Sequence, residues 1–162
     1  MDNIVDSDQI WKAASISGHR SIGPNSKKRV WDAVQLLVDN STIKSIYFGG
    51  ARGTDTEALK AALYHRKGLF PRLIVVLPNT IEQQPVDTHQ WTRRADDLVE
   101  LKQVITSEDG YLSYRRRNEY LVDRGTFLVA FFNGNFKSGT GQAISYAEKS
   151  GKTVYRISIS SA

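Results

Sequence analysis

Short apolar runs alternate along the chain with segments in which apolar residues recur at helical spacing. The run Arg72–Leu77 is continuous, which is typical of a strand buried on both faces of a parallel sheet. The run Thr126–Phe132 is the most hydrophobic of the chain. Together these patterns predict strands over residues 12–17, 43–48, 72–77, 104–107, 126–132 and 152–158.

Helical periodicity separates these strands. Val30, Val34 and Leu37 fall on one face of a helix that begins at about residue 26. Further helices are predicted over residues 55–66, 92–102, 111–123 and 141–149. Because strands and helices alternate through short connections, the sequence predicts an α/β fold with an open, mostly parallel sheet and helices on both faces.

Three of the predicted strands end in glycine-rich turns. These turns cover residues 18–21, 49–55 and 133–141. In an open α/β sheet, ligands bind outside the carboxyl ends of the strands, near the point where the strand order reverses, so the three turns can share one crevice. Backbone amides and a helix N-terminus at such a turn attract anions, phosphate above all.

The second of these turns reads Gly-Gly-Ala-Arg-Gly-Thr-Asp over residues 49–55. Its glycines permit positive φ angles and a close approach of the backbone to a ligand. We expect Thr54 or Asp55 to cap the following helix and Glu57 to help close its first turn, so that both carboxylates act as caps rather than as acid–base groups. Arg52 adds a charged donor inside the turn. The alternative is an ordinary strand–helix turn that happens to be rich in glycine.

The length and composition of the chain narrow the class of protein to which it can belong. The length of 162 residues predicts one domain, residues 12–162, after a short lead-in of residues 1–11. The chain contains no cysteine, which excludes disulfides, thiolate zinc sites and cysteine nucleophiles. The N-terminus is acidic, unlike a signal peptide, and no apolar run is long enough to span a bilayer. We therefore expect a cytoplasmic protein without membrane association.

Basic residues exceed acidic ones, 22 against 17, for a net charge of +5. This excess suits a phosphate-bearing partner, and a solvated basic face is the alternative. Arg20, Arg52 and Arg117 can each form bidentate contacts with phosphate. His19 can contact phosphate or base, and Lys137 is a further phosphate contact in the last turn.

The aromatic and histidine side chains are further candidates for the site. Trp91, Tyr111 and Tyr114 either form a lid that stacks on a base or pack against the edge of the sheet. His65 and His89 are expected on the surface. With three scattered histidines and no ligand spacing, we expect no metal site. The full set of predicted nucleotide-binding residues is Gly18, His19, Arg20, Gly49, Gly50, Ala51, Arg52, Gly53, Thr54, Asp55, Arg117, Asn118, Asn133, Ser138, Gly139 and Thr140.

Four segments resemble a known family when they are taken in order. They are Ile-Ser-Gly-His-Arg at 16–20, Gly-Gly-Ala-Arg-Gly-Thr-Asp at 49–55, Arg-Asn at 117–118 and Ser-Gly-Thr at 138–140. Their order resembles the SLOG superfamily, and most closely the Rossmann core of DNA-processing protein A (DprA), over about residues 12–158. The pair Ser107-Glu108 also matches that family's order. The resemblance implies a Rossmann-like fold, a phosphate- or nucleotide-binding crevice and a homo-oligomer.

The sequence also departs from the families it resembles. Glu119 stands where the DprA pattern has its second arginine, so the single-stranded DNA surface of that family is not fully reproduced. The cytokinin-activating phosphoribohydrolases, another SLOG branch, have a glutamate where this chain has Ala143. Gly53 to Glu57 mimics the Gly-Thr-x-x-Glu motif of those enzymes but lies in the first half of the chain.

Three functions follow from these observations. The leading hypothesis is a non-catalytic or weakly catalytic module, without a further cofactor, that senses or sequesters a small phosphorylated nucleotide. The second is a protein that binds single-stranded DNA, like the DprA core. The third is an N-glycosidic hydrolase of nucleoside monophosphates, which needs a carboxylate at the ribosyl bond; Glu57 is the weak candidate for that role.

Overall fold

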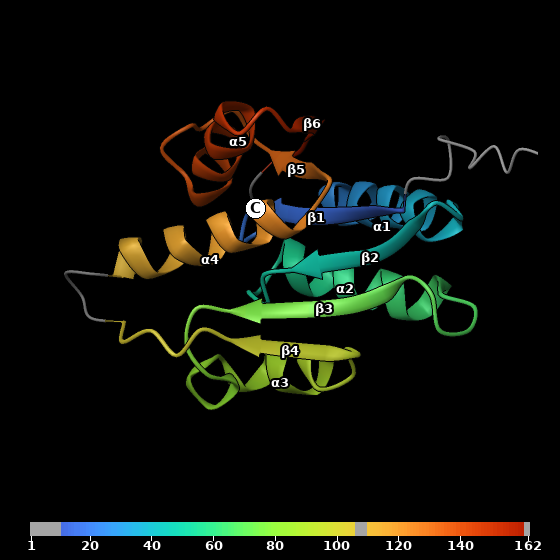
Figure 1. The fold of residues 1–162 in the computed structure, drawn as a ribbon, viewed down its shortest axis with the longest axis horizontal. Coiled ribbons are helices and arrows are strands. Elements are labelled where there is room, and N and C mark those ends of the chain that lie inside the picture. The colour runs from blue at the N-terminus through green and yellow to red at the C-terminus, as the bar shows by residue number, and fades with distance from the viewer. Residues whose placement is uncertain (1–10, 106–109, 161–162) are drawn as a thin grey trace, which may run out of the picture.

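Six parallel strands form the centre of the protein in the computed structural model, which describes residues 11–105 and 110–160 (Figure 1). The strand order across the sheet is β4-β3-β2-β1-β5-β6. The strands are β1 (Lys12–Gly18), β2 (Ile43–Phe48), β3 (Arg72–Leu77), β4 (Asp97–Glu100), β5 (Phe127–Phe132) and β6 (Thr153–Ser158). The helices are α1 (Pro24–Asp39), α2 (Thr54–His65), α3 (Val86–Thr92), α4 (Gly110–Arg124) and α5 (Gly139–Lys149), with a short 3-10 turn at Ile81–Gln83.

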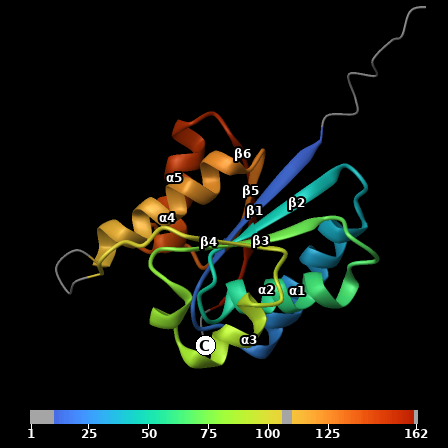
Figure 2. The same ribbon diagram turned by 60° about the horizontal axis from the view of Figure 1, so that its bottom comes forward.

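The helices cover both faces of the sheet, as predicted. Helices α1, α2 and α3 lie on one face, and α4 and α5 lie on the other (Figure 2). Val30 and Val34 of α1 and Leu59 of α2 are buried against the inner strands on the first face. On the second face, Ile144 of α5 packs against β5 and Leu121 of α4 packs against β3. The central strands are therefore buried on both sides, which explains their continuous apolar runs.

The order of the strands creates one reversal. The chain steps outward from β1 to β4, and α4 then carries it back across the sheet to β5, which pairs with the other side of β1. In that pairing Gly18 aligns with Phe131, so the carboxyl ends of β1 and β5 meet at the same edge. This edge is the topological switch point at which ligands bind in open α/β sheets.

Two predicted elements were wrong. The segment 92–102, predicted as a helix, contains the edge strand β4, and the helix in this region ends at Thr92. Partners distant in sequence fix this strand: the Asp96 carboxylate accepts the Leu73 amide at 2.8 Å, and Arg72 forms an ion pair with Asp97. The strand predicted over 104–107 is absent at residues 104–105, and its other half falls outside the described residues.

Candidate functional site

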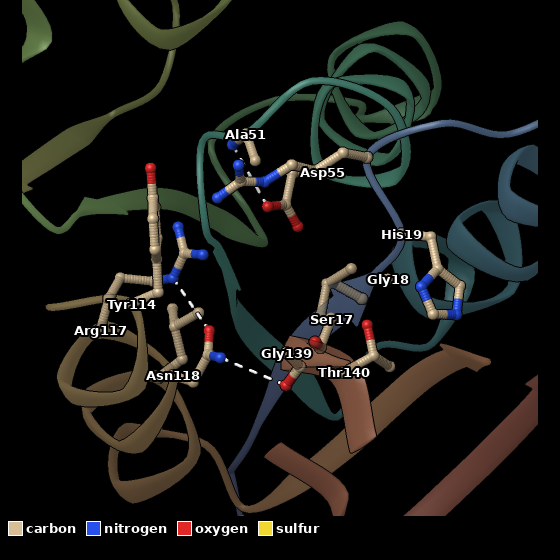
Figure 3. Close-up of a pocket in the computed structure, with 13 residues that line it drawn as sticks. Ser17, Gly18, His19, Ala51, Asp55, Tyr114, Arg117, Asn118, Gly139 and Thr140 are labelled. Carbon is tan, nitrogen blue, oxygen red and sulfur yellow. Dashed lines mark hydrogen bonds between the residues drawn. The ribbon is translucent and has the colours of Figure 1, made fainter. Parts of the chain in front are cut away.

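A cavity of about 360 Å³ opens at the carboxyl ends of β1 and β5 (Figure 3). Residues from all three glycine-rich turns line it, together with one face of α4. Ligand sites typically have volumes of roughly 300–1,000 Å³, so this cavity is of a size for a small ligand. Its lining residues are Ile16, Ser17, Gly18, His19, Arg20, Ala51, Asp55, Tyr114, Arg117, Asn118, Leu121, Gly139 and Thr140.

Arg117 and Asn118 of α4 connect the second turn with the third. The Arg117 side chain is only 7% exposed, and its Nη1 donates to the Gly49 carbonyl oxygen at 2.5 Å. Its Nε donates to Asn118 Oδ1 at 3.0 Å, and Asn118 Nδ2 in turn donates to the Gly139 carbonyl oxygen at 3.3 Å. Figure 3 shows the part of this chain that runs from Arg117 through Asn118 to Gly139 along one side of the cavity. The guanidinium group is therefore held in one position before any ligand arrives.

Asp55 of α2 places a buried carboxylate beside this guanidinium group. Its Oδ2 accepts the Ala51 amide at 3.2 Å, whereas its Oδ1 is buried and has no hydrogen-bond partner in the described part of the chain. Burial raises the pKa of Asp55 and lowers the pKa of Arg117, so for each group desolvation outweighs the attraction of the other. Such a pair contributes little net stability.

The N-terminus of α5 forms another wall of the cavity. The helix begins at Gly139, two residues earlier than predicted, with Ser138 as its N-cap. The Ser138 hydroxyl accepts the Gly141 amide at 3.1 Å. Gly139 and Thr140 line the cavity as the first two helical residues, whose amides have no partner within a helix. The third turn thus presents a positive helix end to the cavity.

The second turn differs from the prediction in its helix cap. Gly53, with a φ of 78°, is the N-cap of α2, and Thr54 is the first helical residue, so the prediction of a Thr54 or Asp55 cap was wrong. The Thr54 amide and hydroxyl both donate to the His19 carbonyl oxygen, at 3.0 and 2.9 Å. A Cβ on Gly53 would lie 2.2 Å from the Arg20 carbonyl oxygen. This glycine therefore lets the first two turns pack together, and the first amide of α2 is already occupied by protein.

Glu57 lies outside the cavity and does not close the first turn of α2 as expected. Its carboxylate accepts the Trp31 indole N–H at 2.9 Å and forms ion pairs with Lys27 and Lys60. Burial alone would raise the pKa of Glu57, but the Trp31 hydrogen bond and the two lysine charges outweigh it and lower the pKa. The carboxylate is thus engaged on the far side of α2.

The remaining cations and His19 lie around the cavity and its rim. The Arg20 guanidinium carbon lies 4.4 Å from the centre of the Tyr114 ring. Arg52 lies on the rim, where its Nη2 and the Asp87 carboxylate form an exposed ion pair at 2.8 Å. His19 Nε2 accepts a hydrogen bond from the backbone N–H of Asn133 at 3.1 Å. Burial lowers the pKa of His19.

Several predicted residues lie behind the cavity rather than on its surface. Gly49 supplies the carbonyl that holds Arg117, and Gly50, with a φ of 74°, packs against Leu77. Asn133 donates its backbone N–H to His19, as described above. Lys137 is exposed in the loop before α5.

The predicted aromatic and histidine residues do not all lie where the sequence analysis placed them. Tyr114 lines the cavity, but Trp91 of α3 lies against Lys60, 4.8 Å from its Nζ, at a different hollow. Ser107, Glu108 and the Tyr111 side chain lie outside the described residues. His89 is buried and its Nε2 contacts the Gln84 carbonyl oxygen at 2.8 Å, so its predicted surface position was wrong.

Three lining residues were not predicted: Ile16, Ser17 and Leu121. The helical spacing of Tyr114, Arg117 and Leu121, at intervals of three and four, is the signal that places all three on one face of α4. In residues 11–105 and 110–160, no helix is long and apolar enough to cross a membrane. Nor do three His, Asp or Glu side chains gather there in a way that suits a metal ion.

Comparison with known proteins places this geometry in a structural context. No family model matches the chain. Solved structures of DprA superpose on it with TM-scores of 0.70 for the Helicobacter pylori protein and 0.72 for the Streptococcus pneumoniae protein. The chain therefore shares the Rossmann-like fold of the DprA core. The predicted resemblance to the DprA core is thus confirmed at the level of the fold, whereas the link to the phosphoribohydrolases stays a prediction.

The superposed structures cover most of this chain at low sequence identity. The H. pylori protein is 21% identical, with 93% of this chain and 68% of that chain covered. The S. pneumoniae protein is 17% identical, and this chain (92% covered) spans about half of it (51%). A molybdenum cofactor binding protein from Rippkaea orientalis has a TM-score of 0.66 and 17% identity, with 92% and 77% covered.

In sequence, the uncharacterized SPbeta prophage-derived protein YoqJ of Bacillus subtilis (strain 168) is 25% identical. The match covers 81% of this chain and 86% of YoqJ. Solved structures that share this fold are described as binding either single-stranded DNA or a molybdenum cofactor. The fold alone therefore does not select a ligand, and the residues of the cavity have to do so.

Proposed function

We propose that this protein binds a small phosphorylated nucleotide in the cavity at the β1–β5 switch point and acts by sensing or sequestering it. The observation that carries the proposal is the convergence of the first turn of α5 and the buried Arg117 on one cavity. The backbone amides of Gly139 and Thr140 and the Thr140 hydroxyl are donors for phosphate oxygens, and the helix dipole favours the negative charge.

Arg117 supplies the charged part of the phosphate site. Two of its hydrogen bonds fix the guanidinium group to Gly49 and Asn118, which leaves further N–H donors of the same group for a ligand. Because the group is already ordered, little side-chain entropy is lost on binding. A buried pair whose pKa values are both shifted toward the neutral forms is typical of a functional site, which supports a role for Arg117 and Asp55 beyond stability.

The positions of the acidic residues support a binding function rather than a hydrolytic one. Asp55 is the only acidic residue among the described residues that line the cavity, and it is nine-tenths buried against the second turn. Glu57, the candidate from the sequence, forms ion pairs outside the cavity. A hydrolase of N-glycosidic bonds needs a carboxylate that reaches the ribosyl bond. We therefore propose a binding module and not an enzyme.

Single-stranded DNA is the second candidate ligand. A row of cations and aromatic rings continues from the cavity across the rim, from Arg20 and Tyr114 past Arg52 to Lys60 and Trp91. Alternation of cations and aromatic rings suits a nucleic-acid strand. Affinity that rises with oligonucleotide length and falls steeply with salt would favour this candidate.

Extraction and thermal-shift experiments test the proposal. Small molecules released from the denatured protein are identified by mass spectrometry, and the purified protein is then screened against mono-, di- and cyclic nucleotides. At about 100 times its Kd, a nucleotide that binds stabilises the fold by about 2.7 kcal/mol, which raises Tm by about 5–10 °C.

Paired variants link this shift to the cavity. Arg117→Gln should abolish the shift, and Arg115→Gln, on the exposed side of α4 and paired with Glu119, should retain it. Because Arg117 is buried, a circular dichroism spectrum first checks that the variant is folded. No bound molecule and no shift with any nucleotide would overturn the proposal.

A further inference from the structure

A second cavity, of about 270 Å³, opens directly beside the first. Four residues line both cavities: Arg20, Ala51, Tyr114 and Arg117. The shared wall includes the cation–π pair of Arg20 and Tyr114, in which the guanidinium carbon lies over the ring, 4.4 Å from its centre. Two chambers thus adjoin each other, and this pair belongs to both.

Cations but no carboxylates line the second chamber in the described part of the chain. Its lining contains Arg20, Arg52 and Arg117, and none of its eight lining residues in the described part of the chain is acidic. Arg20 forms no ion pair within residues 11–105 and 110–160. Arg52 is paired with Asp87, but both side chains are about 60% exposed, and an exposed pair of this kind is weak. A phosphate can therefore replace Asp87 at Arg52, since guanidinium groups bind phosphate through two parallel hydrogen bonds.

The shared wall also offers a surface for a flat ligand group. The guanidinium carbons of Arg20 and Arg117 lie over the Tyr114 ring, 4.4 Å and 5.6 Å from its centre, so two guanidinium groups accompany one aromatic ring. Nucleobases stack on aromatic rings and on arginine planes. The second chamber therefore combines the two chemistries that a nucleotide needs, a phosphate-binding cation at the rim and a stacking surface at the wall.

We propose that the natural ligand carries two nucleotide units, one in each chamber. The inference rests on the proposed function: the first unit binds at the α5 N-terminus, and the second places its base against the cluster of Arg20 and Tyr114 and its phosphate at Arg52. The chemical class is a dinucleotide. A mononucleotide occupies only the first chamber and leaves the charge of Arg52 without a ligand partner.

Calorimetry separates the two chambers. The probes are the four nucleoside 5′-monophosphates, the four matching 5′-phosphorylated homodinucleotides and the four homododecamers. At least one dinucleotide should bind about tenfold or more tightly than its own mononucleotide, because a second stacked and charge-paired unit is added. Arg52→Gln should remove most of that gain and leave the mononucleotide affinity unchanged.

A matched variant controls for the loss of a surface charge. Arg93→Gln removes an arginine that is similarly exposed and similarly paired, with Glu82, but lines neither chamber. It should bind both probe classes as the original protein does. Equal losses of dinucleotide affinity in the Arg52 and Arg93 variants would overturn the proposal.

The probe series also distinguishes this inference from the proposed function. Mononucleotide binding with no gain for any dinucleotide would overturn the two-chamber inference and leave the proposed function standing. No binding of either class would overturn both. Affinity that keeps rising from dinucleotide to dodecamer would also overturn the two-unit ligand and would support single-stranded nucleic acid instead.

Discussion

Asp55 and Arg117 place opposite charges against the same turn from two different helices. Arg117 Nη1 donates to the Gly49 carbonyl oxygen, and Asp55 Oδ2 accepts the Ala51 amide two residues later. The residues are only 6% and 7% exposed, respectively. Because burial raises the pKa of Asp55 and lowers that of Arg117, each group depends on the other to remain charged.

A double-mutant cycle should measure this dependence. Asp55→Asn or Arg117→Met alone leaves one buried charge without its partner, which we expect to cost about 3–5 kcal/mol in the free energy of unfolding. The double variant should cost clearly less than the sum of the two, with a coupling of about 1 kcal/mol or more. Urea unfolding provides the four free energies. Additive losses would show that the charges do not interact.

His19 predicts a specific dependence of stability on pH. Burial lowers its pKa, although a contact with the Asn133 side chain acts in the opposite direction. A histidine with a lowered folded-state pKa contributes stability that is present above its unfolded pKa of about 6.5 and is lost as the pH falls through the folded pKa. The urea concentration at the midpoint of unfolding should therefore decrease as the pH is lowered from 7.5 to 5.5.

His19→Gln isolates this contribution. Glutamine can place an uncharged oxygen close to the position of Nε2, where it accepts the Asn133 amide and does not titrate. The variant should unfold with a weaker pH dependence below pH 6.5 than the original protein. Identical slopes in the two proteins would show that His19 is not the source.

Local signals explain how much of the fold and the site could be predicted. The buried strand Arg72–Leu77 matches its predicted range because a continuous apolar run bounded by turn residues is a local pattern. The three turns converge because parallel strands place their carboxyl ends at one edge, and each turn follows such a strand. For the same reason Arg117, Asn118, Gly139 and Thr140 were predicted together and do line one cavity.

The failures share a cause in contacts that are distant in sequence. Strand β4 is short, and its residue Asp97 pairs with Arg72, which is 25 positions away. Nothing in the sequence indicated that Arg52, a predicted phosphate contact, forms an ion pair with Asp87, 35 positions away. Gly53 caps α2 in place of Thr54 because the Thr54 hydroxyl donates to His19 instead. Periodicity carries no information about such partners. The homo-oligomer also stays a prediction.

Gly53 should tolerate no side chain. A Cβ at this position would lie 2.2 Å from the Arg20 carbonyl oxygen, and the φ of 78° is unfavourable for alanine in addition. Gly134 has a similar φ of 94° but nothing within 4 Å of its Cβ position, so it reports the backbone cost alone. Gly134→Ala should lower the unfolding free energy by about 1–2 kcal/mol, and Gly53→Ala by clearly more. Equal losses in thermal or urea unfolding would contradict the packing of the first two turns.

The amide of Gly139 offers the sharpest test of the phosphate site. Proline is favoured at the first helical position and lacks an N–H, and the extended backbone of Ser138 (φ −76°, ψ 166°) is compatible with a following proline. Gly139→Pro should therefore keep α5 and remove one donor to the phosphate. Gly139→Ala keeps the donor, and its Cβ would lie at an ordinary 3.6 Å from Asn118 Nδ2.

The two variants should differ in their affinity for the nucleotide but not in their fold. A hydrogen bond to a charged group is worth about 1.5–3 kcal/mol, so Gly139→Pro should weaken binding of the nucleotide that gives the largest thermal shift by about 10- to 100-fold. Gly139→Ala should bind that nucleotide nearly as the original protein does. Calorimetry measures both affinities, and circular dichroism confirms equal helix content. Equal affinities for the proline and alanine variants would place the phosphate away from the N-terminus of α5.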